Sequence, residues 1–175
     1  MPIERPPLLL LGGEEAFNAY KAEFDRLYRT EPIRAIHPNY PEGIAIHFDA
    51  DRARHVCFAE VKSDRYKQGP RLWVQERAER IRWIQLALTQ PDEVRAGHTD
   101  PRNLAYLLTI LANPAGNPPE TQERYGVYIE RPDREGHARF CSGYPLDEIT
   151  WMNARKVGPR LYPPPKPKAS KGKNR

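Results

Sequence analysis

Hydrophobic residues recur along the chain at two spacings, which separate a helical first part from a strand-rich second part. Residues 14–29 place aromatic and aliphatic side chains on one helical face, and Glu14 and Glu15 suit the positive N-terminal end of such a helix. A longer helical pattern covers residues 71–90, with Pro70 at its entrance and Pro91 at its end. We therefore expect one long amphipathic helix at 71–90.

Shorter runs are rich in β-branched and aromatic residues. The runs "IAIHF" (44–48) and "HVCF" (55–58) are joined by the polar stretch "DADRAR", which predicts a hairpin. Past the helix, loops rich in Gly, Pro, Asn and Asp separate four further runs, at 92–95, 103–111, 124–130 and 137–144. The pattern predicts an α+β fold, in which an N-terminal helical region precedes a four-stranded, mostly antiparallel sheet.

Composition and charge divide the chain further. Residues 1–43 form an N-terminal extension with one helix, residues 44–162 a single domain, and residues 163–175 a basic tail that we expect to be disordered. The tail carries five basic residues and accounts for the net charge of +5, so the body holds 23 basic and 23 acidic residues. Within the body, residues 51–82 carry nine basic against five acidic residues, which places any surface for an anionic partner there.

Arg77 is the residue that the helical pattern does not explain. On a helix over 71–90 it falls inside the apolar sector, between Ile84 and Leu88. An isolated buried charge is costly, so this guanidinium must be paired or must face a cleft. Three interpretations follow: an ion pair with a strand carboxylate such as Glu130, a side chain that extends its charged end out to solvent, or a site that binds phosphate.

Several motifs resemble one nuclease family. The stretch "ERAERIRWIQLALTQPDEVR" followed by "YGVYIERPDREGHARFCSGYPL" is similar to the phage-associated barnase/EndoU/colicin/RelE-like (BECR) nucleases. The resemblance covers about residues 44–162 and includes the Arg77-Ala78 pair. It implies a four-stranded antiparallel sheet and metal-independent cleavage of RNA, including tRNA, by a toxin or phage effector. Many such proteins are neutralised by an immunity protein or antitoxin. In one motif this chain departs from the family, since Ser142-Gly143-Tyr144 stands where relatives often have Thr-Ala-Tyr.

RNA cleavage without a metal needs proton transfer and stabilisation of the charge on the phosphorane. Histidine suits the proton transfer, and the resemblance favours His55 over His47 as base or acid. We assign Arg77 and Ser142 to the scissile phosphate as further catalytic residues. The candidate substrate-binding residues are Arg80, Lys62, Arg65, Lys67 and Tyr144.

The sequence offers little support for other chemistry. It has no Gly-rich phosphate loop, and the acids near His47 and His55 suit turns better than a metal, so we expect neither metal nor cofactor. Cys57 and Cys141 lie in apolar runs and are expected to be buried thiols. We expect a cytoplasmic ribonuclease with RNA as its partner and no membrane contact. The alternative is a non-catalytic nucleic-acid-binding module or a phage adaptor protein.

Overall fold

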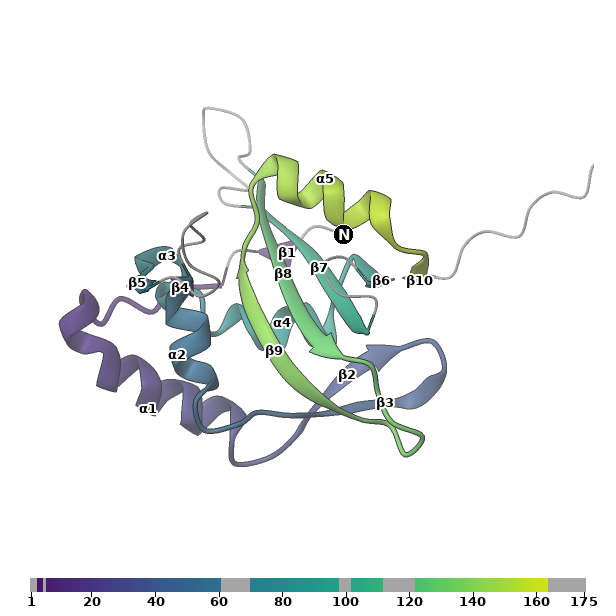
Figure 1. The fold of residues 1–175 in the computed structure, drawn as a ribbon, viewed down its shortest axis with the longest axis horizontal. Coiled ribbons are helices and arrows are strands. Elements are labelled where there is room, and N and C mark those ends of the chain that lie inside the picture. The colour runs from purple at the N-terminus through teal and green to yellow at the C-terminus, as the bar shows by residue number, and fades with distance from the viewer. Residues whose placement is uncertain (1–2, 5, 61–69, 98–101, 112–121, 164–175) are drawn as a thin grey trace, which may run out of the picture.

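The fold is a strongly curled sheet with helices on both faces (Figure 1). The computed structural model describes residues 3–4, 6–60, 70–97, 102–111 and 122–163. The strands are β1 (Ile3–Glu4), β2 (Ile33–His37), β3 (Tyr40–His47), β4 (Phe58–Glu60), β5 (Arg71–Trp73), β6 (Glu93–Ala96), β7 (Asn103–Leu111), β8 (Gln122–Glu130), β9 (His137–Pro145) and β10 (Arg160–Tyr162). The helices are a short 3-10 turn, η1 (Glu14–Ala16), and α1 (Phe17–Tyr28), α2 (Arg52–Cys57), α3 (Gln75–Glu79), α4 (Trp83–Thr89) and α5 (Glu148–Val157).

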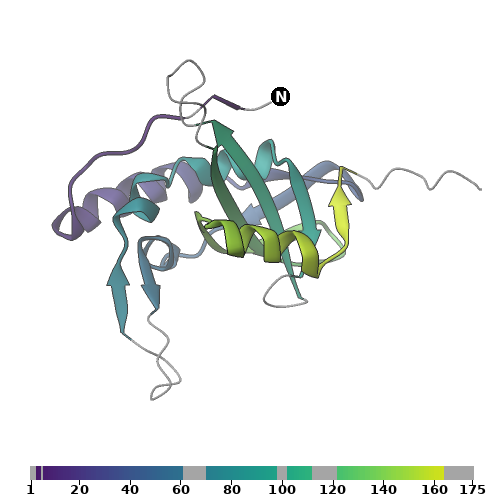
Figure 2. The ribbon, with the colours of Figure 1, turned by 90° about the horizontal axis from the view of Figure 1, so that it is seen from above.

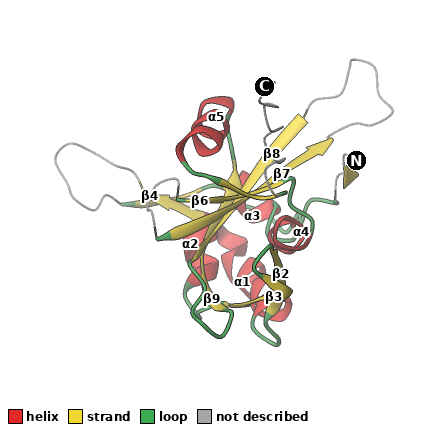
Figure 3. Cartoon of the chain, turned by 90° about the vertical axis from the view of Figure 1, so that its right-hand side faces the viewer, coloured by secondary structure: helices red, strands yellow, loops and turns green. Residues whose placement is uncertain are grey.

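The main sheet has the strand order β10-β6-β7-β8-β9-β3-β2, and β1 pairs with β7 outside this path. The α+β prediction is confirmed, and the four expected strands are present as β6 to β9, antiparallel to one another. The prediction of a four-stranded sheet is wrong, because β10 adds to the edge of β6, while β3 adds to the edge of β9 in parallel and brings β2 with it. The resulting seven-stranded mixed sheet curls into a half-barrel (Figure 3).

The predicted hairpin between 44–48 and 55–58 does not form. β3 pairs with β2 instead, since the segment before residue 44 supplies a strand whose buried residues alternate with exposed ones. Residues 52–57 form α2, and only Phe58 begins a strand, β4, which pairs with β5. Periodicity could not distinguish a short buried helix from a short buried strand here.

Two hydrophobic clusters cover the two faces of the sheet. The main core joins α1 and α4 to one face, with Tyr20, Phe24 and Trp83 fully buried. A smaller cluster packs α5 on the other face, where Trp151 and Ala154 contact the sheet. Figure 2 shows α5 on the side of the sheet opposite to α1 and α4. Residues 17–37, which the sequence placed in an extension, contribute α1 and β2 to the same core.

The helix predicted at 71–90 is divided. Residues 71–73 are strand β5, and the helical part breaks between α3 and α4. In a continuous helix the Arg80 amide would donate to the Glu76 carbonyl. That carbonyl instead accepts from Arg80 Nη1 at 3.0 Å, while the Arg80 amide donates to the Arg77 carbonyl. The backbone turns are tighter at this point, because the Arg80 side chain occupies the carbonyl that the Arg80 amide would use in a continuous helix.

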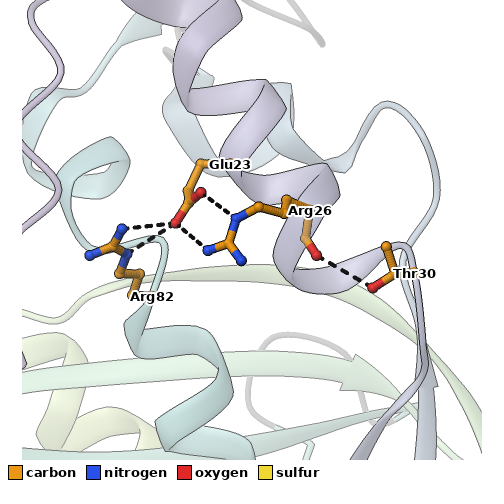
Figure 4. A network of polar contacts seen from close by, with 4 residues as sticks. All are labelled: Glu23, Arg26, Thr30 and Arg82. Carbon is orange, nitrogen blue, oxygen red and sulfur yellow. Dashed lines mark hydrogen bonds and ion pairs between the residues drawn. The ribbon is translucent and has the colours of Figure 1, made fainter.

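An ion-pair network fixes α1 to this break (Figure 4). Glu23 on α1 accepts hydrogen bonds from Arg82 Nη2 at 2.9 Å and from Arg26 Nε at 2.8 Å. These two cations lower the pKa of the Glu23 carboxyl to about 2. Within the described part of the chain, no helix is long and apolar enough to cross a membrane.

Candidate functional site

A β-bulge in β9 decides which side chains of this strand face α5. Tyr128 of β8 pairs with Ser142, but the next residue, Ile129, pairs with Phe140, so Cys141 is an extra residue. Phe140 belongs to the main core, whereas Cys141 and Tyr144 pack against the α5 cluster. Without the bulge, strict alternation would turn residues 142 and 144 toward the main core with Phe140. With it, Ser142 and Tyr144 share the α5 face.

Arg77 lies against this part of β9. Its guanidinium carbon is 4.4 Å from the centroid of the Tyr144 ring, which in turn stacks on Tyr128 at 5.3 Å. The side chain is half-buried, and burial lowers its pKa, while the nearby Tyr144 and Tyr125 raise it slightly. Among the residues that the structure describes, no carboxylate lies within ion-pair distance of it, and Glu130 does not pair with it. A desolvated guanidinium without a counter-ion is suited to binding an anion.

Arg80, only three residues away, has a different environment. Its Nε and Nη2 atoms donate to Glu123 Oε2 at 3.1 and 2.9 Å, and its Nη1 atom donates to the Glu76 carbonyl. It also stacks on the Trp83 ring at 5.0 Å. The Arg80 guanidinium, which we expected at the substrate, is therefore committed to contacts within the protein.

His55 lies on α2, so the expectation that it opens a strand is wrong. Its Nε2 atom is 3.4 Å from Asp51 Oδ2, one helical turn earlier. Burial lowers the pKa of the imidazole, and Arg71 and Arg52 lower it further, against a weaker opposite effect of Asp51. The ring is therefore neutral near pH 7, which is the form that accepts a proton.

Helix α2 packs against both β9 and α3, and its buried residues belong to the main core. Arg52, in its first turn, reaches the Cys141 carbonyl with Nη1 at 3.5 Å. Arg52 was not among the site residues predicted from the sequence. Its place in the basic stretch 51–82 was the available signal, but only the helical conformation of 52–57 brings it to the bulge.

The remaining candidates lie elsewhere or are not described. Lys62, Arg65 and Lys67 fall outside the described residues. His47 is exposed at the end of β3, and its ring contacts that of His137 at 5.6 Å, where β9 begins. Tyr144 lies at the opposite end of β9, so His47 belongs to a different region.

Among the described residues, one group with metal-binding chemistry lies beside His47. The carboxylates of Asp133 and Glu135 lie 3.6 and 3.7 Å from His137 Nδ1, in the exposed turn between β8 and β9. Asp133 also accepts the backbone amides of Glu135 and His137, so the turn itself accounts for its position. Neither cysteine forms a disulfide bond within the described part of the chain: Cys57 is buried, as predicted, whereas Cys141 is only partly buried, at the bulge.

Comparisons with protein-family models, with curated protein sequences and with solved structures find no match to this chain. The resemblance to the nuclease family therefore rests on the sequence motifs alone. The site itself rests on geometry: a bulged strand, an arginine held on a tyrosine stack, and a helix that carries Arg52 and His55.

Proposed function

We propose that this protein is a metal-independent endoribonuclease whose active site lies over the bulge of β9. The observation that carries the proposal is the Arg77 guanidinium. It is desolvated, it stacks on Tyr144 beside Ser142, and within the described part of the chain it has no carboxylate partner. Such an arrangement disfavours the free cation and favours a bound phosphate, which would supply the missing counter-charge.

Each side chain then has a distinct role. Arg77 binds the scissile phosphate through bidentate hydrogen bonds from its guanidinium and stabilises the negative charge of the transition state. Ser142 donates a hydrogen bond to a phosphate oxygen. Tyr144, whose ring is engaged by Arg77 and Tyr128, is a positioning residue for Arg77 and no longer a candidate for stacking a base.

His55 acts as the base in the chemical step. Neutral His55 accepts the proton of the ribose 2′-hydroxyl, and the 2′-oxygen attacks the adjacent phosphorus. The bond from phosphorus to the 5′-oxygen breaks, and the leaving oxygen takes a proton from water. The products are a 2′,3′-cyclic phosphate and a 5′-hydroxyl end.

A cleavage assay on single-stranded RNA in the presence of EDTA tests the proposal. We expect the wild type to produce cyclic phosphate ends, and Arg77→Ala and His55→Ala to lose most of this activity. His47→Ala is the matched control, because His47 is exposed at the other end of the sheet, and it should retain activity. RNA binding without cleavage by the wild type would refute the enzyme and favour the non-catalytic nucleic-acid-binding module.

A further inference from the structure

A cluster of metal-binding side chains lies in the turn between β8 and β9, at the end of β9 opposite to Tyr144. Asp133, Glu135 and His137 each offer one ligand atom, and these atoms lie within 4.8 Å of one another. The distances from His137 Nδ1 to Asp133 Oδ2 and to Glu135 Oε2 are 3.6 and 3.7 Å, which is too long for hydrogen bonds. Two ligands of a tetrahedral Zn²⁺ ion, bound at about 2.0–2.1 Å, lie about 3.4 Å apart. The spacing of the three atoms therefore fits a shared ion better than direct hydrogen bonds.

Hydrogen bonds hold the turn that carries these side chains. Asp133 Oδ1 accepts the amides of Glu135 and His137, each at 2.9 Å, which leaves Oδ2 as the carboxylate oxygen next to the imidazole. The turn is also bonded to the neighbouring strand, because the Ala45 amide of β3 donates to the Gly136 carbonyl at 2.8 Å. The ligand atoms are thus brought together before an ion binds, which reduces the entropic cost of binding.

A fourth ligand comes from β3. Ala45 pairs with His137, and His47 follows two residues later, so its side chain lies on the same side of the sheet as that of His137. The two imidazole rings are 5.6 Å apart between centroids and are inclined at 63°. Two imidazoles that bind one tetrahedral ion through bonds of about 2.1 Å have ring centres about 5 Å apart. A small side-chain rotation therefore suffices for His47 to bind the same ion as His137.

The donor set and its charge favour zinc. Two imidazole nitrogens and two carboxylate oxygens are ligands that Zn²⁺ accepts in tetrahedral sites, and the two carboxylates balance its charge. Among the described residues, no Lys or Arg side chain forms an ion pair with Asp133 or Glu135, so no fixed cation competes with the ion for them. The side chains of the turn are exposed, and the ion can reach them directly from solvent.

We infer that Asp133, Glu135, His137 and His47 bind one Zn²⁺ ion, which links β3 to the turn between β8 and β9. The link lies at the parallel pairing of β3 with β9, through which β2 and β3 join the antiparallel part of the sheet (Figure 1). The ion stabilises this junction. It takes no part in RNA cleavage, because Arg77 contacts Tyr144 at the other end of β9, so the site is independent of the proposed nuclease.

Isothermal titration calorimetry with ZnCl₂ tests the inference on the full chain, after treatment with EDTA and exchange into buffer without chelator. The ligand variants are His137→Ala, Glu135→Gln and His47→Ala. The matched control is His55→Ala, because His55 lies near the Asp51 carboxylate, at 3.4 Å, but belongs to no group of three ligands among the described residues. Thermal unfolding of each variant in EDTA shows that it is folded. The Glu135 side chain is 81% exposed, so Glu135→Gln tests the site without disturbing the core.

The wild type and His55→Ala should bind one Zn²⁺ ion with the same Kd, and zinc should raise the Tm of both. Each ligand variant should weaken Kd by at least about 10-fold, since loss of even an outer partner of a metal ligand costs about 10- to 100-fold. A wild type that binds no zinc would overturn the site, and so would ligand variants with the Kd of His55→Ala. Unchanged affinity in His47→Ala alone would refute the link to β3. The RNA cleavage assay is run in EDTA, so its outcome is separate from that of the zinc titration.

Discussion

Replacing Arg77 or Arg80 by alanine should have opposite consequences, although the two arginines are only three residues apart. Arg77 stacks on Tyr144 and has no counter-ion in the described part of the chain, whereas Arg80 is paired with Glu123. We predict that Arg77→Ala removes activity and keeps stability, and that Arg80→Ala removes stability and keeps activity.

The stability effect follows from the contacts of Arg80. Its side chain is 11% exposed and that of Glu123 is 23% exposed, so the ion pair is largely shielded from water. The variant loses two charged hydrogen bonds and the contact with the Glu76 carbonyl, and it leaves the Glu123 carboxylate without Arg80. We expect a loss of about 2–4 kcal/mol in the free energy of unfolding, which lowers Tm by roughly 5–15 °C.

In the Arg77→Ala variant, two contributions to the free energy of unfolding oppose each other. The variant loses a cation–π contact of about 0.5–2 kcal/mol, but it also relieves the cost of keeping a desolvated charge that has no carboxylate partner among the described residues. The free energy of unfolding should therefore stay within about 1 kcal/mol of the wild type. Loss of the phosphate contact should lower kcat/KM by about 10²–10³-fold, which is typical for removal of a single donor to the transition state.

The assay combines thermal unfolding with kcat/KM for RNA cleavage at a temperature well below every Tm. Arg34→Ala, at an exposed position of β2, is the control for loss of one arginine and should change neither quantity. Cleavage by Arg77→Ala at the wild-type rate would refute the role of Arg77. A fall in its Tm as large as that of Arg80→Ala would show that Arg77 is a structural residue.

Three further predictions concern pH and packing. Because the folded pKa of Glu23 is about 2, its contribution to stability is present above the ordinary value of 4.5 and is lost as pH falls toward 2. Glu23→Gln should lower the free energy of unfolding by about 1–2 kcal/mol at pH 7 in urea titrations, with a difference that vanishes near pH 2. If His55 is the base, kcat/KM should fall with decreasing pH through an inflection below pH 6.5. Because Arg71 lowers the pKa of His55, Arg71→Gln should move that inflection upward, and an unchanged inflection would contradict this role of His55. Gly143→Ala places a Cβ atom 3.2 Å from Ile84 Cγ1 and should lower the free energy of unfolding by about 1 kcal/mol. An unaltered Tm would show that α4 moves to accommodate the methyl group without loss of stability.

Local patterns predicted the second half of the fold better than the first. The runs that became β6 to β9 are long or bounded by turn residues, so their spacing sufficed to identify them. The run at 55–58 was predicted as a strand, whereas residues 52–57 form a helix, because a short apolar run fits either conformation. α5 was not predicted, although Asp147 caps it by accepting a hydrogen bond from the Thr150 amide.

The sequence by itself determined that the chain has a helix within residues 14–29, antiparallel strands in the second part, and an arginine on an apolar helical face that needs an explanation. The reason is that backbone periodicity, turn residues and the cost of an unpaired charge all act over a few neighbouring residues. The tertiary structure decided which of the two arginines lacks a carboxylate partner among the described residues, because Glu123, which pairs with Arg80, comes from a strand 43 residues further along the chain. It also decided the face of Ser142 and Tyr144, since the bulge at Cys141 exists only in the register between β8 and β9.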